Sequence, residues 1–363
     1  MIKKLGTAIS EYSVRNKLDE EIPVYSVTNE QGFCTGYFSK DVASKDRTTY
    51  KIVPYGYFAY NPSRINVGSV DWQHSEERVI VSPLYVVFGV DESVDKRYLL
   101  HYLKSDIARM LIKNYASGSV RDNLKLSTLM EFPFNFRSLE EQKEIANVLD
   151  KIDYLIGVQK QRMDYFDRLV KSRFIELFGN YINEGGKPLS ELATITGGLT
   201  KNSKRNAFNL KMPYLRVANV FFNRLDLNEI LEIGVREDEI GKTLLQTGDL
   251  LFVEGNGSIE QIGRVAIWDG SISPILHQNH LIKARFHKKT ILPEFALFYF
   301  MSQEGRQQII SKSVSTSGLN TLSVNKISSL ILPMPPIELQ KQFAAFVAQT
   351  DKSKLFSEME VAA

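Results

Sequence analysis

Three short stretches carry residue types that enzymes use, and each lacks a part that its chemistry requires. Residues 240–243 (IGKT) end like a phosphate-binding loop, but the first glycine of such a loop would fall at Arg236, so the turn that presents backbone amides to phosphate is missing. Residues 252–257 lack the glycine spacing of a cofactor loop. Residues 61–63 (NPS) lack the second proline and the aromatic ring with which amino-methyltransferases hold a target amine.

Two further groups could hold a metal ion, and both are incomplete. His277 and His280 lie close in sequence, but no cluster of cysteines or carboxylates completes a ligand set. This favours structural or solvent-facing histidines. The carboxylates in residues 91–95 precede Lys96 in a loose likeness to nuclease signatures, a pattern that is common on surfaces. The sequence therefore indicates no catalytic constellation, and we expect no metal site.

The element that must position any binding surface is a long helix predicted over residues 139–178. Its apolar residues recur at alternating intervals of four and three, the heptad spacing of a helix that buries one narrow stripe against another helix. At about 1.5 Å per residue it would be roughly 60 Å long, which suits a spacer or a docking rail. The alternative is a long helix packed inside one domain. The stripe comprises Ile145, Leu149, Ile152, Ile156, Gln159, Met163, Phe166, Val170, Arg173 and Leu177.

The segments before and after this helix follow one plan. In each, short β-branched or aromatic runs typical of strands come first, and two stretches with helical spacing follow. A polar loop and a short apolar segment complete each plan. Residues 139–142 (LEEQ) align with residues 337–340 (IELQ), an offset of 198 residues (139 to 337). A duplicated unit of one globular domain plus one helix is the simplest account, and chance similarity is the alternative.

The second copy of the helix is predicted to be cut short. Thr350 and Lys354 fall where the heptad stripe needs Ile152 and Ile156. Four segments are therefore expected: a first domain over 1–138, a central helix over 139–181, a second domain over 182–336 and a shortened helix over 337–363.

Composition sets the class of protein. The 363 residues are 43% hydrophobic and 11% aromatic, which is ample for two or three folded domains. No apolar run is long enough for a membrane span, and the N-terminus lacks the apolar core of a signal peptide. The single cysteine, Cys34, rules out an internal disulfide and fits a reducing cytosol. The net charge of +3, from 45 basic and 42 acidic residues, permits nucleic-acid binding without demonstrating it.

Two globular domains, each ending in Leu/Ile-Glu-x-Gln and a long helix, resemble the DNA-specificity subunit of type I restriction–modification enzymes. The resemblance covers most of the chain. Its landmarks are residues 132–153, 173–179, 248–252 and 332–353, and the joint Pro-Pro-Ile-Glu-x-Gln at 335–340 is fairly specific in this duplicated context.

The resemblance implies an α+β protein with two α/β target-recognition domains, separated by a long coiled-coil helix, and a shortened second helix at the C-terminus. In that family each domain reads one half of a split DNA site, and the helices pack antiparallel and recruit methyltransferase subunits. A cytoplasmic, non-catalytic subunit is implied. Its partners would be double-stranded DNA, methyltransferase (modification) subunits and restriction/translocase subunits. S-adenosylmethionine, ATP and Mg²⁺ are expected on those partners, and no cofactor is expected on this chain.

Under this resemblance the polar loops become candidate DNA contacts. Base edges are read by Arg, Lys, Asn, Gln and Ser side chains on loops that enter a groove. The loops over 60–69, 201–206 and 254–264 supply such groups, and the loops around Gly118 and Gly318 offer hydroxyls and amides for phosphates. Ordinary solvated turns are the alternative. The candidates are Asn61, Ser63, Arg64, Asn66, Ser69, Ser119, Arg121, Lys201, Lys204, Arg205, Asn256, Ser258, Gln261, Arg264, Ser317 and Asn320.

A shortened second helix can cover only part of the long helix. We predict that the apolar stripe over residues 163–177 stays uncovered and meets a second protein, either another copy of this chain or a methyltransferase helix. The predicted partner-binding residues are Ile145, Leu149, Ile152, Ile156, Met163, Phe166, Val170 and Leu177. A scaffold with two binding domains on a helical rod, and no role in DNA binding, is the alternative function. A stand-alone methyltransferase or nuclease is disfavoured by the missing motifs.

Overall fold

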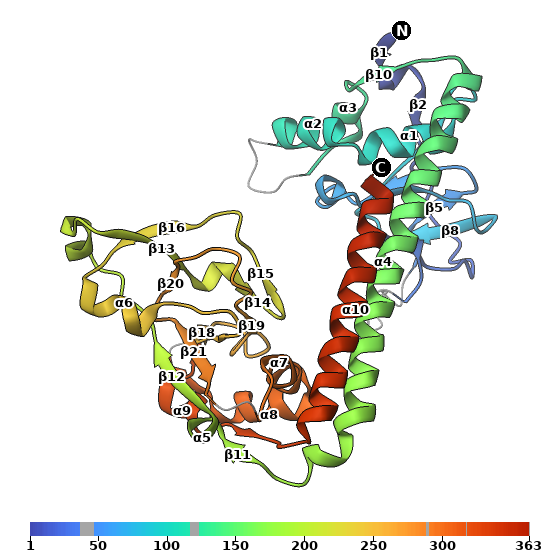
Figure 1. Cartoon of the computed structure of the whole chain (residues 1–363). Helices are drawn as coiled ribbons and strands as arrows, with labels where there is room; N and C mark the ends of the chain where they lie inside the picture. Colours follow the sequence, from blue (N-terminus) through green and yellow to red (C-terminus); the bar gives the residue numbers. More distant parts are fainter. Residues whose placement is uncertain (37–46, 117–122, 288–289, 317, 363) are drawn as a thin grey trace. The chain divides into compact units, whose positions relative to one another are not determined.

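The structure is a computed structural model that describes residues 1–36, 47–116, 123–287, 290–316 and 318–362 (Figure 1). It divides into two compact units, Met1–Gly157 and Val158–Ala363. The boundary between the units falls inside the long helix α4 (Leu139–Ile182), so each unit contains one globular domain and part of α4. Within the described residues, none of the helices combines the length and the hydropathy that crossing a membrane requires.

The first unit is built on a four-stranded antiparallel sheet in the order β2-β9-β6-β7. Its strands are β2 (Ile9–Glu11), β9 (Val86–Val90), β6 (Phe58–Tyr60) and β7 (Val70–Trp72). The other pairs are β1 (Ile2–Lys4) with β10 (Pro133–Asn135), β3 (Ser26–Thr28) with β4 (Gly32–Cys34) and β5 (Lys51–Pro54) with β8 (Arg78–Val81). The helices are α1 (Lys96–Lys104), α2 (Asp106–Ala116), α3 (Leu126–Leu129) and the 3-10 turns η1 (Leu5–Thr7) and η2 (Ile65–Val67).

The second unit repeats this sheet in the order β12-β21-β17-β19, again antiparallel. These strands are β12 (Ala193–Gly197), β21 (Leu281–Phe286), β17 (Leu250–Val253) and β19 (Val265–Ile267). Further strands are β11 (Lys187–Pro188), β13 (Lys211–Leu215), β14 (Val220–Phe221), β15 (Arg224–Leu225), β16 (Leu231–Gly234), β18 (Gly255–Asn256), β20 (Leu276–His277), β22 (Val314–Thr316), β23 (Leu319–Thr321) and β24 (Ile331–Leu332). The helices are α5 (Leu189–Leu192), α6 (Glu237–Thr243), α7 (Pro293–Met301), α8 (Gln303–Lys312), α9 (Val324–Ser328), α10 (Ile337–Ala362) and the 3-10 turns η3 (Ser203–Ala207) and η4 (Val217–Asn219).

The glutamine of the LEEQ joint ties α4 to the first domain. Gln142 is fully buried, and its Nε2 donates to the carbonyl oxygens of Ser93 (2.9 Å) and Arg137 (3.0 Å). Its Oε1 accepts the backbone N–H of Asp95 at 2.9 Å, and Asp95 is the N-cap residue of α1. One amide side chain therefore fixes the start of α4 against the start of α1, since buried polar groups must be paired.

The IELQ joint makes the equivalent contacts in the second domain. Gln340, also fully buried, donates from Nε2 to the carbonyl oxygens of Thr290 (3.0 Å) and Pro335 (2.8 Å). Its Oε1 accepts the N–H of Leu292, the N-cap residue of α7, at 2.8 Å. The duplication predicted from the sequence is thus present in sheet order and in the hydrogen bonds of the two joints.

The core of the second unit includes a cluster of phenylalanines. Phe174 and Phe178 of α4 lie 5.4 and 5.5 Å, ring centre to ring centre, from Phe343 of α10. Phe295 of α7 lies 4.8 Å from Phe178. All four side chains are buried. The second half of α4 is therefore part of a hydrophobic core, through Phe174 and Phe178, each of which directly follows a residue of the heptad stripe.

Helix α10 packs antiparallel along the second half of α4 (Figure 1, where α10 is red and α4 green). The guanidinium of Arg173 lies 5.9 Å from the ring centre of Phe346. Farther along α10, Lys354 Nζ lies 2.6 Å from Asp167 Oδ1. Near the end of α10, the Ser357 hydroxyl donates to Gln159 Oε1 at 2.6 Å.

This direction of packing corrects the predicted uncovered stripe. The stripe residues within 163–177 are buried or half-buried on the side of α4 that packs against α10. This is because in an antiparallel pair the end of a short second helix meets the middle of the first. Large apolar side chains that stay exposed on the first half of α4 include Val148 (57%), Ile152 (46%), Leu155 (55%) and Ile156 (42%).

Helix α10 spans nearly all of the segment 337–363 that was predicted as the shortened helix. The buried Thr350 satisfies its hydroxyl by donating to the carbonyl oxygen of Phe346 at 2.9 Å. Polar residues at stripe positions thus find partners within the helix or across it, and the helix continues to Ala362.

Candidate nucleic-acid interface

The structure brings two predicted loops of the second domain together. Residues 254–264 connect β17 to β19 and include β18, which pairs with β23 in the register Asn256 to Asn320. Asn320 is buried, and its Nδ2 donates at 3.3 Å to the carbonyl oxygens of Asn256 and Gly257. Asn320 therefore holds the loop in place, and its side chain is not free for a ligand.

Three side chains of this loop remain available at the surface. Ser258 is exposed, and Asn256 and Gln261 are half-buried. Asn256 Oδ1 accepts the N–H of Ser258 at 2.9 Å, a local turn that sets the direction of the loop. These amide and hydroxyl groups are of the kind that reads base edges.

The corresponding loop of the first domain lies between β6 and β7. Asn61 Oδ1 accepts the N–H (3.1 Å) and the hydroxyl (2.9 Å) of Ser63. Ser63, Arg64 and Asn66 are exposed. Ser69 is buried and donates its hydroxyl to the carbonyl oxygen of Val27 at 2.5 Å, so it has a structural role.

A small polar pocket of about 190 Å³ lies under this first loop. Arg64, Asn61 and Ser69 line it together with Thr28 and Asn29, which sequence reasoning did not single out. No motif marks these two residues, since the β3–β4 hairpin brings them to the pocket.

The loop over residues 60–69 is hydrogen-bonded to Leu124, which follows the predicted loop around Gly118. Leu124 donates its N–H to the carbonyl oxygen of Pro62 at 3.1 Å, and the Tyr60 hydroxyl donates to the carbonyl oxygen of Leu124 at 3.0 Å. Burial raises the pKa of Tyr60, so its hydroxyl stays a donor. Both domains thus pair a strand-end loop with a later segment. Three predicted contacts, Ser119, Arg121 and Ser317, lie outside the described residues.

Arg205 is the candidate whose surroundings argue most directly against a DNA contact. Its buried guanidinium donates from Nη1 and Nη2 to the two carboxylate oxygens of Glu239 at 3.0 and 2.9 Å, and from Nε to the carbonyl oxygen of Thr200 at 2.6 Å. These hydrogen bonds lower the pKa of Glu239 to about 2. Arg205 fastens η3 to α6, whereas its neighbours Lys201 and Lys204 are exposed.

The side chain of Arg264 is half-buried and packs against neighbouring residues. Its guanidinium carbon lies 5.1 Å from the ring centre of Phe221, and its Nη2 donates to the carbonyl oxygen of Val217 at 3.4 Å. Sequence reasoning left out two further arginines: Arg224 stacks on the same ring of Phe221, and Arg306 stacks on the neighbouring Phe222. Their sequence positions carry no motif, because Arg306 of α8 meets the β14–β15 hairpin only in the folded chain.

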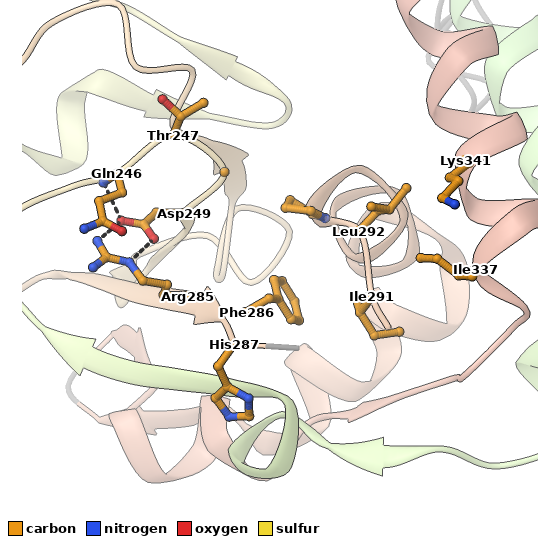
Figure 2. A pocket seen from close by; sticks show the side chains of 12 residues that line it. Gln246, Thr247, Asp249, Arg285, Phe286, His287, Ile291, Leu292, Ile337 and Lys341 are labelled. Atoms are coloured by element: carbon orange, nitrogen blue, oxygen red, sulfur yellow. Dashed lines mark hydrogen bonds and ion pairs between the residues drawn. The ribbon is translucent and has the colours of Figure 1, made fainter. Parts of the chain in front are cut away.

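A pocket of about 600 Å³ in the second domain contains a buried ion pair (Figure 2). Arg285 donates from Nε and Nη2 to the two carboxylate oxygens of Asp249 at 2.7 and 2.6 Å. Asp249 also accepts the N–H of Gln246 at 2.8 Å. The opposite charges neutralise each other, so Arg285 and Asp249 form a satisfied structural pair.

The two histidines serve separate contacts. His277 is buried and donates from Nδ1 to the carbonyl oxygen of Thr243 at 2.8 Å. Burial lowers the pKa of His277 to about 4, so its ring is neutral near pH 7. His280 Nδ1 instead lies 2.7 Å from Glu254 Oε2. In the part of the chain that the structure describes, no group of three or more His, Cys, Asp or Glu side chains could hold a metal ion.

The chain matches the family described as "Type I restriction modification DNA specificity domain" over residues 3–164 and again over residues 186–359. The chain belongs to this family. The two matches fall one on each copy of the duplicated sheet-and-helix plan, so the repeat in the fold is the repeat of the family's domain.

Relatives agree with this assignment. The chain is 26% identical over 311 residues to the type I restriction enzyme EcoKI specificity subunit of Escherichia coli K12, covering 79% of this chain and 65% of the relative. It is 31% identical over 163 residues to the putative MjaX specificity subunit of Methanocaldococcus jannaschii, covering 44% of this chain and 37% of the relative. The chain thus spans less than two thirds of the length of either relative.

Solved structures show the same fold. The type I restriction–modification S subunit from M. genitalium matches with a TM-score of 0.55 at 14% identity, covering 100% of this chain and 92% of that one. A chain from a structure concerned with complex assembly in a type I R-M system matches with a TM-score of 0.50, at the same identity and coverage. The predicted fold class, two mixed domains with one long and one shorter helix, is confirmed.

Proposed function

We propose that this chain is the DNA-specificity subunit of a type I restriction–modification complex. It would bind double-stranded DNA at a split site, with one half-site read by each domain. The observation that carries the proposal is the double match to the specificity-domain family, one match for each domain. In both domains a strand-end loop with amide, hydroxyl or guanidinium groups is fastened to a neighbouring segment.

Exposed side chains would contact the DNA, and buried side chains would hold the loops in place. Asn256, Ser258 and Gln261 in one domain, and Arg64 and Asn66 in the other, would face the bases, since donors and acceptors in the major groove distinguish base pairs. Lys201 and Lys204 would contact phosphates, which position a protein without reading sequence. Ser69, Arg205 and Asn320 would only support these surfaces.

The chemistry of the complex would belong to other subunits. We propose that this chain is not catalytic and works in the cytoplasm, and that methyltransferase and restriction/translocase subunits bind S-adenosylmethionine, ATP and Mg²⁺. A scaffold with two binding domains and no role in DNA binding remains the second candidate.

Selection of DNA by the full-length chain tests the proposal. The chain, alone and with candidate methyltransferase subunits, would be mixed with random duplexes, and the bound fraction sequenced. Enrichment of two short motifs at one fixed spacing is expected. A bound pool without sequence preference under every combination would contradict the proposal and favour the scaffold.

Arg64 is expected to affect one half-site only. No described carboxylate pairs with its exposed guanidinium, so Arg64→Ala should cost about 1–3 kcal/mol of discrimination at one base position. The selected motif should lose information there and keep the other half. Arg78→Ala is the matched control, because Arg78 is bound to Glu20 at 2.6 Å. Equal weakening on all sequences would make Arg64 a phosphate contact.

The exposed stripe on the first half of α4 is proposed as the docking site of a methyltransferase helix. Ile152 and Ile156 belong to the heptad stripe, and Val148 and Leu155 directly precede stripe positions. All four side chains are exposed, which is unusual for large apolar side chains so close together. Association with a second copy of this chain is the competing occupant.

A charge on the stripe should separate docking from DNA binding. Leu155→Glu is expected to abolish co-purification with the methyltransferase subunits while leaving the affinity of the isolated chain for DNA unchanged. Lys151→Glu, an exposed change on the same helix, should keep the complex. If light scattering showed a dimer of the wild-type chain that Leu155→Glu converts to a monomer, the stripe would be a self-association surface instead.

A further inference from the structure

The hairpin of β14 and β15 lies beside the recognition loop of the second domain. Its turn is Phe222–Asn223, and Asn223 has a positive φ of 48°. Asn223 donates its N–H to the carbonyl oxygen of Val265 at 2.9 Å. Since Val265 begins β19 directly after the 254–264 loop, the hairpin turn is attached to the end of that loop.

Three guanidinium groups stack on the two phenylalanines of this hairpin. The guanidinium carbons of Arg224 and Arg264 lie 4.4 and 5.1 Å from the ring centre of Phe221. That of Arg306, from α8, lies 5.0 Å from the ring centre of Phe222. Cation–π contacts of this kind hold guanidinium groups in place without neutralising their charge.

Arg306 uses its donors to shape the loop. Its Nη1 donates to the carbonyl oxygen of Ile262 at 2.7 Å and its Nη2 to that of Glu260 at 3.1 Å. The contact to Glu260 is with the backbone, so the charge of Arg306 is not balanced. Arg264 in turn has a buried Nε without a hydrogen-bond partner.

The missing counter-charge distinguishes these three residues from the other arginines of the domain. Residues 182–336 contain seven arginines. Four of them pair with a carboxylate, namely Arg205 with Glu239, Arg216 with Glu229, Arg236 with Asp238 and Arg285 with Asp249. Among the described residues, no carboxylate pairs with Arg224, Arg264 or Arg306.

Three arginines that lack a carboxylate partner in the described part of the chain favour the binding of an anion. Burial lowers the pKa of Arg264 and of Arg306, but a guanidinium remains protonated near neutral pH. An anion would balance the charge of these three groups, for which the described residues supply no carboxylate partner. A phosphodiester suits the site, because guanidinium groups bind phosphate oxygens through several N–H donors.

We propose that Arg224, Arg264 and Arg306, stacked on Phe221 and Phe222, form a phosphate-binding cluster that positions the recognition loop on the DNA backbone. The cluster carries no base specificity itself. Arg264 accordingly moves from the predicted base-reading set to the phosphate contacts. This inference rests on the proposed function and adds the place where the duplex backbone would lie against the second domain.

The salt dependence of binding tests the cluster. Each phosphate contact contributes a slope of about −0.9 to log Kobs against log salt, so Arg224→Gln, at the exposed member, should reduce the slope by about one and the binding constant by about eightfold at 0.1 M salt. Titrations would use the full-length chain with random-sequence duplex from 0.05 to 0.2 M salt. The motif selected from random duplexes should be unchanged.

Two variants control this test. Arg236→Gln removes the same charge from an exposed arginine that is bound to Asp238, and should leave slope and affinity as in the wild type. Arg224→Lys should keep the slope, since the charge remains.

The outcomes separate this inference from the proposed function. If the wild-type chain binds DNA and Arg224→Gln keeps the full salt slope, the phosphate-binding cluster is disproved but the proposed function is not. If Arg224→Gln changes the selected bases of one half-site with the slope intact, Arg224 reads bases and the cluster is also overturned. If the wild-type chain binds no duplex, both the cluster and the proposed function fail.

Discussion

Phe343→Ala is expected to lower the free energy of unfolding of the second unit by roughly 3–5 kcal/mol, the usual cost of truncating a buried aromatic side chain. Phe343 is fully buried, and its ring contacts phenylalanines of both α4 and α7. Its ring packs edge-on against Phe178 and Phe298 at 5.5 and 5.1 Å. The cavity would open where three helices meet, so backbone collapse could fill little of it.

Urea denaturation followed by circular dichroism would measure this loss as a lower midpoint. Phe356→Ala is the matched control, since Phe356 lies on the same helix and is 68% exposed. It should change the midpoint little. Equal shifts for the two variants would show that α10 is not anchored through Phe343.

Gln340→Met is expected to cost roughly 3 kcal/mol, because it keeps the volume of the side chain and leaves three backbone groups without partners. Those groups are the N–H of Leu292 and the carbonyl oxygens of Thr290 and Pro335. Gln142→Met should have a similar effect on the first unit, where the same three kinds of contact exist.

The two glutamine variants should act on different parts of the chain. Hydrogen exchange measured by mass spectrometry would show faster exchange in α7 and α10 for Gln340→Met, and in α1 and the start of α4 for Gln142→Met. Gln342→Met, at an exposed position of α10, is the control. If hydrogen exchange at α7 were unchanged in Gln340→Met, the contacts of Gln340 at the IELQ joint would not be a source of stability.

Much of the architecture was predictable because its signals are local. The heptad spacing predicts α4, which begins at the expected Leu139. There the hydroxyl of Ser138 accepts the N–H of Glu141 at 3.2 Å, while the Glu141 carboxylate accepts the N–H of Ser138 at 2.9 Å. The repeated Glu-x-Gln predicts the duplication, since each glutamine makes the same contacts in its own domain.

Side-chain roles in the loops were less predictable. Arg205 and Arg224 are both arginines in polar surroundings in the sequence, yet one is neutralised by Glu239 and the other has no carboxylate partner among the described residues. The difference arises because α6 and η3 meet in space, whereas the β14–β15 hairpin meets β19. Neither contact can be recognised from the spacing of residues in the sequence.

By itself the sequence determined the family, the duplicated plan and the existence of a long helix with a shorter copy, because periodicity and repeated motifs are properties of the chain alone. Only the tertiary structure decided which half of the long helix is covered. Heptads allow parallel and antiparallel pairs alike, and it is the burial of Phe343 against Phe178 that brings the start of α10 to the end of α4. That contact leaves Val148, Ile152, Leu155 and Ile156 as the exposed run.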